Sequence, residues 1–244
     1  MLARIHDLLE IDAQRFLHAN SSAPAWVAES LAATPFVVVR RGPAVAGEIA
    51  VGVRGEARNQ RWAGSCPESC VRRIVTPGEL LTGVRLALRV PPTPSGTSTA
   101  SGAPTASAAP ALPRTNSIPA LRSLALLSHN ETWTSLQHHW GPGGSVGFEL
   151  ATARHTATPQ SDLDIVIYAG DRLTVEEAKR LHAATRELPS AVDVRVETPV
   201  CGFSCTEYAS RAPSPILLRT SAGTVLGTDP WAGSPNSPIP TSRP

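Results

Sequence analysis

The chain has 244 residues, enough to bury one large core or two modest ones, so one or two domains are expected. Its net charge of +2 argues against a protein held on nucleic acid by a basic face, so we expect no nucleic-acid partner. No apolar stretch reaches the ~18 residues needed to cross a bilayer, and the N-terminus lacks the apolar centre of a signal peptide. We therefore expect a soluble, cytoplasmic protein with no membrane partner.

Residues 1–89 are expected to form a small N-terminal α/β domain that binds a substrate or a partner. Residues 6–9 and 11–17 have helical spacing, and a further short helix is expected from Pro24. The β-branched runs at 36–39 and 50–53 predict strands. Thr76 followed by Pro77 and by Glu79 predicts the start of a helix that closes this unit.

A change of composition separates this unit from the rest of the chain. Residues 90–119 consist mainly of Pro, Ser, Thr, Ala and Gly, with almost no charge and little to bury. Such a segment cannot offset its ordering entropy, so we predict a disordered linker. Residues 233–244 are again rich in Pro and Ser and are expected to form a flexible tail.

Residues 120–232 are expected to form the second domain. The pattern predicts a helix over 121–133, a strand over 161–167, and a capped helix from Thr174 to about residue 188. Further strands are expected over 192–197 and 216–220. The whole chain is therefore predicted to be an α+β protein.

Two carboxylates on alternate positions of the first of these strands are the most informative feature. Asp162 and Asp164 share one face of the strand, because successive side chains point to opposite faces. Carboxylates side by side repel each other unless a cation lies between them, and Mg²⁺ is the usual one because it binds carboxylate oxygen and leaves places for phosphates. The alternative is a solvated strand edge or a turn cap. As a third metal ligand we prefer Asp193 and keep Glu197 in reserve.

A glycine-rich turn precedes these carboxylates. The segment Gly143-Gly144-Ser145 offers backbone N–H groups suited to a phosphate. No strand leads into a G-x-G-x-x-G turn, and no G-x-x-x-x-G-K-[ST] motif is present, so dinucleotide and P-loop sites are not indicated. Carboxylates, Mg²⁺ and a phosphate-binding turn together predict a phosphoryl or nucleotidyl transferase.

The cysteines form two pairs, Cys66 with Cys70 and Cys201 with Cys205. A four-thiolate zinc site would account for them, but zinc ligands more often lie two residues apart, so we favour reduced, partly buried thiols. The histidines at 129, 138 and 139 are expected to be surface or core residues.

The glycine turn followed by Asp-hydrophobic-Asp resembles the polymerase-β type of nucleotidyltransferase superfamily. More narrowly, residues 140–152 with 161–164 resemble the phosphoribosyl-dephospho-CoA transferases of malonate decarboxylase. Other stretches agree with this family, namely 6–9, 24–27, 51–55, 60–63, 192–199, 217–220 and 229–231. The resemblance implies a polymerase-β-like catalytic domain in the second unit, a mixed sheet with flanking helices.

The resemblance also implies an activity. Such an enzyme transfers the phosphoribosyl-dephospho-CoA group from 2′-(5″-triphosphoribosyl)-3′-dephospho-CoA to a serine of the malonate decarboxylase acyl carrier protein, and releases pyrophosphate. By the same resemblance Asp162 and Asp164 bind the metal, and Gly144 and Ser145 hold the triphosphate. A nucleotidyltransferase with another hydroxyl acceptor and a non-catalytic carrier-binding protein remain as alternatives.

Arginines of the first unit are candidates for the same substrate. Arg54, Arg58 and Arg61 follow a predicted strand, where a loop would let them reach the triphosphate or the CoA-like moiety. The equally open alternative is a solvated, arginine-rich loop. Arg40 and Arg41 are ambiguous in the same way.

Overall fold

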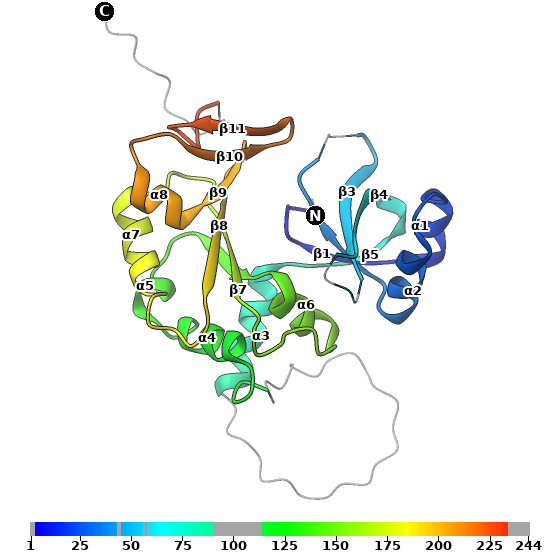
Figure 1. The fold of residues 1–244 in the computed structure, drawn as a ribbon, viewed down its shortest axis with the longest axis horizontal. Helices are drawn as coiled ribbons and strands as arrows, with labels where there is room; N and C mark the ends of the chain where they lie inside the picture. The colour runs from blue at the N-terminus through cyan, green and yellow to red at the C-terminus, as the bar shows by residue number, and fades with distance from the viewer. Residues whose placement is uncertain (1–2, 43–44, 56, 58, 90–113, 234–244) are drawn as a thin grey trace, which may run out of the picture.

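The computed structural model describes residues 3–42, 45–55, 57, 59–89 and 114–233. These residues form a mixed α and β structure with two separate sheets (Figure 1). After the first sheet the chain enters α3 (Pro77–Arg89), and two further helices precede the first strand of the second sheet. The prediction of a mixed protein with strands in both halves is confirmed.

The first sheet is antiparallel, with the strand order β4-β3-β2-β1-β5. Its strands are β1 (Leu8–Ile11), β2 (Phe36–Val39), β3 (Glu48–Arg54), β4 (Arg61–Pro67) and β5 (Val71–Val75). Helices α1 (Ala13–Ala19) and α2 (Ala25–Ala33) pack on one face, and a short 3₁₀ turn, Glu68–Cys70, precedes β5. Phe16, Val27 and Leu31 from the helices meet Val51 of β3 in this core.

The second sheet has the order β11-β10-β9-β8-β7-β6, and within it β7 and β8 are parallel while the other pairs are antiparallel. Its strands are β6 (His139–Pro142), β7 (Leu163–Tyr168), β8 (Val192–Glu197), β9 (Gly202–Ser204), β10 (Ile216–Thr220) and β11 (Gly223–Gly227). The helices of this unit are α4 (Pro119–Leu127), α5 (Glu131–Thr134), α6 (Gly144–Thr152), α7 (Val175–Ala183) and α8 (Cys205–Arg211).

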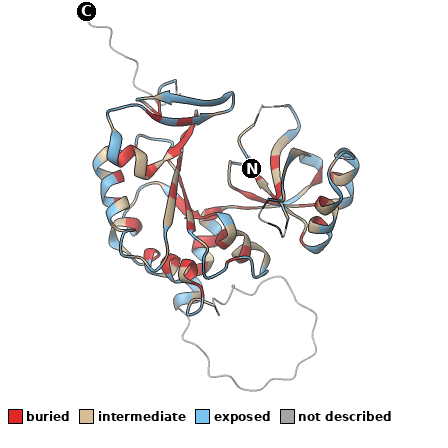
Figure 2. Cartoon of the chain, in the orientation of Figure 1, coloured by how far each residue is buried: buried red, intermediate tan, exposed pale blue. Residues whose placement is uncertain are grey.

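One face of the second sheet is apolar and the other is polar. Leu163, Ile165 and Ile167 of β7 are buried in one core with residues of α4, α7 and α8. Figure 2 colours the buried positions along these strands and helices red. Because strand side chains alternate, the remaining positions of β7 and β8 face the other way, toward the first unit. There, Tyr168 Oη donates to the Ile5 carbonyl oxygen at 2.8 Å. The sheet thus presents its polar residues at the boundary between the two units.

The helical prediction for residues 6–9 is wrong, because these residues lead into β1. Leu9 is buried beneath α1 and α2, whereas Leu8 is buried on the opposite face with Leu80 and Phe148 of the second unit. A strand covered on both faces has a continuous apolar run, which imitates the spacing of a buried helix. Only the contact between the two units distinguishes the two cases.

Helix α3 differs from the prediction that it closes the first unit. Its buried residues Leu81 and Val84 belong to the second core. Its start lies against Gly141 of β6, so closely that a Cβ at this glycine would collide with the Pro77 carbonyl. The second core therefore begins at about residue 77 rather than after residue 119.

Two other predicted segments also change. The helix predicted over 121–133 is interrupted at residues 128–130, because the Asn130 side chain accepts from Thr132 N at 3.1 Å and starts α5 anew. Most of the predicted linker, residues 90–113, and the tail from residue 234 lie outside the described residues. Residues 114–119 of the predicted linker are described: Ile118 N donates to the Arg114 carbonyl at 2.9 Å, and α4 begins at Pro119.

Candidate active site

The carboxylates of β7 and β8 are placed side by side by the parallel register of these strands. Asp164 pairs with Asp193, so both project from the polar face of the sheet at the same level. Asp162 precedes β7 by one residue and is exposed. The structure therefore brings Asp193 next to Asp164, a relationship that the sequence left open.

Asp164 is the more enclosed of these carboxylates. Burial raises its pKa above the ordinary value, and the negative charges of Asp193 and Asp162 raise it further, against the lowering effects of Arg195 and His6. A carboxylate whose ionised form is disfavoured in this way gains most from a nearby cation.

A guanidinium provides part of that positive charge. The Arg195 side chain projects from the same face of β8 as Asp193 and binds its Oδ2 through Nη2 at 3.0 Å and Nε at 3.2 Å. The pair is partly exposed, with 29% of the Arg195 side chain and 42% of the Asp193 side chain accessible. Arg195 thus neutralises one of the two facing carboxylates.

The glycine-rich turn lies directly against Asp164. Gly143 N donates to the Asp164 carbonyl at 2.8 Å, and Gly144 begins α6 with φ at +54°. A Cβ at Gly144 would collide with the Asp164 carboxylate, so only glycine allows this approach. Ser145 follows in the first turn of α6 and is partly exposed. The helix start and the paired carboxylates therefore form one continuous site.

Glu197 lies at the far end of the same face, in register with Tyr168. Its carboxylate pairs with Arg41 and lies 3.0 Å from His6 Nε2. Burial alone would raise the pKa of Glu197, but the hydrogen bond and charge of His6 and the charge of Arg41 outweigh burial and hold the pKa below its ordinary value. Through these contacts Glu197 joins the two units, whereas Asp193 is the carboxylate that the register places beside Asp164.

The arginines predicted to bind substrate belong to the first unit. Arg54 and Arg61 face each other at the end of the β3–β4 hairpin, and both are exposed. No hydrogen bond or ion pair connects either of them to the second sheet among the described residues. Arg58 lies outside the described residues.

Several residues that contact this region have no role that the sequence predicts. Arg41 is ambiguous, and His6 and Glu149 lie within stretches that carry the family resemblance but are not predicted site residues. A signal for Glu149 was present, since it lies four residues after Ser145 on the helix, beside buried Val146. A charged residue beside the apolar face of a helix indicates a specific partner.

The four cysteines are free and buried, and the two pairs lie in different cores. Burial raises the pKa of Cys66 and of Cys205 to about 12 in each case. The residues that the structure describes contain no group of three or more His, Cys, Asp or Glu side chains arranged to hold a metal ion. The thiols are therefore inert packing residues rather than a common zinc site.

A helix that crosses a bilayer must be long and apolar. Within the ranges of the chain that the structure describes, none could span a membrane.

Comparison with known proteins covers both units. Residues 4–77 match the family model described as phosphoribosyl-dephospho-CoA transferase MdcG N-terminal domain, and residues 107–230 match the corresponding C-terminal domain. A curated phosphoribosyl-dephospho-CoA transferase of Azotobacter vinelandii is 34% identical over 235 residues, which are 95% of each chain. That of Pseudomonas aeruginosa is 34% identical over 93% of this chain and 92% of its own. One from Klebsiella pneumoniae is 33% identical over 93% and 96%. No solved structure matches significantly.

Proposed function

Because this chain belongs to the phosphoribosyl-dephospho-CoA transferase family, we propose that it transfers a phosphoribosyl-dephospho-CoA group from the triphosphoribosyl precursor to a carrier protein. The acceptor that we propose is a serine of the malonate decarboxylase acyl carrier protein. The observation that carries the chemistry is the juxtaposition of Asp164, Asp193 and the Gly144 turn. It supports a catalytic domain of the polymerase-β nucleotidyltransferase type.

The proposed step is a displacement at phosphorus. The serine hydroxyl oxygen attacks the α-phosphorus of the triphosphate and loses its proton to water. A new O–P bond forms, the bond from this phosphorus to the bridging oxygen of the β-phosphate breaks, and pyrophosphate leaves with the electron pair. The backbone N–H groups at Gly144 and Ser145, at the positive end of α6, are suited to hold the phosphates.

The carboxylates fit a divalent cation. Asp164 and Asp193 supply hard oxygen ligands at one level of the sheet, and because burial and the charge of Asp193 raise the pKa of Asp164, a bound cation would stabilise its ionised form. We propose that these two residues hold Mg²⁺, and that Asp162, which does not form a group of three ligands with them in the described structure, joins them when the cation binds. Bound Mg²⁺ would lower the pKa of the attacking hydroxyl and neutralise charge on the phosphates. Arg195, which otherwise binds Asp193, would then be available to the phosphates.

The decisive experiment mixes the purified protein, Mg²⁺, the triphosphoribosyl precursor and the apo carrier protein, and follows the carrier by mass spectrometry. The proposal expects the carrier mass to increase by one phosphoribosyl-dephospho-CoA group, and pyrophosphate to appear in equal amount. Pyrophosphate release with an unchanged carrier would indicate another hydroxyl acceptor. If neither product forms but the carrier protein stays bound, the result would indicate a non-catalytic carrier-binding protein.

A further inference from the structure

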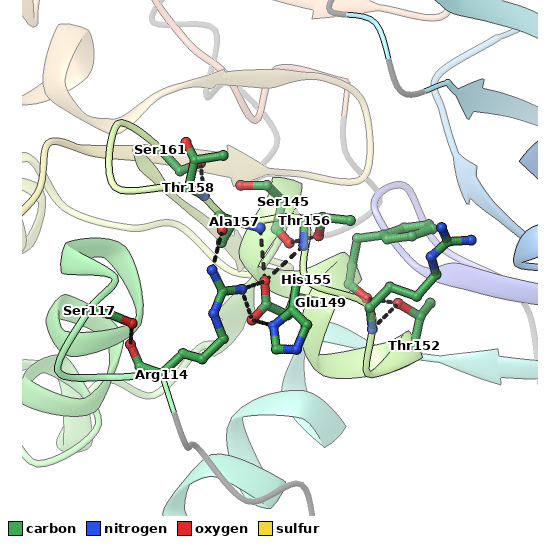
Figure 3. A network of polar contacts seen from close by, with 12 residues as sticks. Arg114, Ser117, Ser145, Glu149, Thr152, His155, Thr156, Ala157, Thr158 and Ser161 are labelled. Carbon is green, nitrogen blue, oxygen red and sulfur yellow. Dashed lines mark hydrogen bonds and ion pairs between the residues drawn. The ribbon is translucent and has the colours of Figure 1, made fainter.

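Glu149 is a buried carboxylate on α6 that serves neither the apolar core nor the paired carboxylates. It is 8% exposed. Its Oε1 and Oε2 accept from Arg114 Nη1 at 2.9 Å and 3.0 Å. Its Oε2 also accepts from the backbone N–H groups of Thr156 at 2.9 Å and Ala157 at 2.8 Å (Figure 3). The carboxylate therefore collects donors from two segments far apart in the sequence.

These contacts fasten the segment after α6 to the helix itself. Arg114 Nη2 donates to the Ala157 carbonyl at 3.2 Å, so one guanidinium binds both the helix and the loop. Thr156 Oγ1 donates to the Ser145 carbonyl at 2.8 Å, one turn before Glu149. Further along, Thr158 N donates to Ser161 Oγ at 2.9 Å, immediately before Asp162 (Figure 3).

The position of this network relative to the candidate site is what gives it a function. The loop fastened by Glu149 begins at the end of α6 and leads through Ser161 to Asp162 and β7. The helix begins at the Gly144 turn, so both ends of the fastened unit lie in the site. A loop of this length would otherwise leave the relative position of Asp162 and Ser145 loosely determined. Reacting groups must be held in place, because a shift of about 1 Å can cost about 10²-fold in rate.

We propose that Arg114 and Glu149 are a positioning pair for phosphoryl transfer, holding the loop of residues 153–158 on α6 so that Ser145 and Asp162 keep their relative places. The inference rests on the proposed function. Neither residue is among those proposed to bind the substrate or the metal. Arg114 uses two nitrogens, Nη1 for both oxygens of the Glu149 carboxylate and Nη2 for the Ala157 carbonyl, and the single nitrogen of a lysine cannot make both contacts.

The test compares Glu149→Gln with Glu176→Gln, a matched control in an exposed ion pair with Lys179. Because a glutamine cannot accept from Arg114 and from both amides as a carboxylate does, amide hydrogen exchange at Thr156 and Ala157 is expected to accelerate at least about tenfold. The kcat for carrier modification is expected to fall about 10²-fold, with the KM for the carrier protein unchanged. The control should alter neither quantity.

Further variants keep the inference testable if Glu149→Gln folds poorly. Arg114→Lys should recover part of the kcat that Arg114→Met loses. Thr156→Val, at an exposed position, removes only the bond to the Ser145 carbonyl and should lower kcat without altering thermal stability.

Fast exchange with an unchanged kcat would overturn the positioning role, and so would unchanged exchange. If the unmodified protein shows no transfer at all, the proposed function fails. The exchange measurement then still decides whether Glu149 holds the loop.

Discussion

Asp164 and Asp193 lie opposite each other on the only parallel strand pair among the described residues, with the Gly144 turn packed against the Asp164 carboxylate. This relationship places two like charges next to a site suited to phosphate. Burial and, after it, the charge of Asp193 raise the pKa of Asp164, while Asp193 forms an ion pair with Arg195.

Asp164→Asn should lower the rate of carrier modification about 10³-fold without loss of stability. Because the folded state raises the pKa of Asp164, ionisation of this carboxyl opposes folding at pH values above the raised pKa. Without added Mg²⁺ the variant should therefore be more stable than the unmodified protein at neutral pH. This difference should shrink as the pH falls through the raised pKa, and vanish below the pKa of the unfolded state. Urea unfolding across that range provides the measurement; lower stability of the variant at neutral pH would contradict the assignment.

Gly144→Ala should impair both stability and activity. The positive φ at this position is strained for alanine, and the new Cβ would displace the Asp164 carboxylate. We therefore expect the free energy of unfolding to fall by about 2 kcal/mol and kcat to fall about 10²-fold. Gly170→Ala is the matched control, since a Cβ there meets no atom within 4 Å. Denaturant titration and carrier modification measure both effects. Full activity of the Gly144 variant would contradict a role for this turn in the transfer reaction.

Arg195→Met should strengthen the binding of Mg²⁺ in the absence of substrate. The guanidinium competes with a cation for Asp193, so its removal is expected to tighten binding about fivefold, as for a partly exposed ion pair worth about 1 kcal/mol. Calorimetric titration with Mg²⁺ measures the change. Arg172→Met, which breaks an ion pair with Asp229 instead, should leave the affinity unaltered. Weaker Mg²⁺ binding by the Arg195 variant would contradict the proposed ligand set.

Glu197→Gln should loosen the contact between the two units. It leaves the largely buried Arg41 without its partner, at an expected cost of about 3 kcal/mol at neutral pH. Because the folded state holds the pKa of Glu197 below its ordinary value, this stabilisation is present at pH values above the unfolded pKa. It is lost as the pH falls through the lowered folded pKa, so the variant and the unmodified protein should converge in acid. Glu176→Gln should cost less than about 0.5 kcal/mol. An equal cost for both variants would refute the role of Glu197.

Local patterns in the sequence determined the parts of the fold that depend on neighbouring residues. The capping box of Thr174 and Glu177 is present: Glu177 N donates to Thr174 Oγ1 at 3.2 Å, and Thr174 N donates to Glu177 Oε2 at 2.8 Å. The alternation around Asp164 and around Asp193 also predicted their strands and the polar face correctly. A cap or an alternation is set within a few residues, so one sequence is enough to recognise it.

Tertiary structure decided everything that depends on which elements meet. The sequence favoured Asp193 over Glu197 as the partner of Asp164, but only the parallel register of β7 and β8 aligned Asp193 with Asp164. Residues 8–11 form a strand with both faces covered: the first core buries Leu9, and residues of the second unit bury Leu8 on the opposite face. Arg114 and Glu149 are 35 residues apart, and their pairing follows from packing that no local pattern encodes. The sequence by itself determined the chemical groups and their faces, whereas long-range packing determined which of those groups meet, because contact between distant residues is a property of the whole chain.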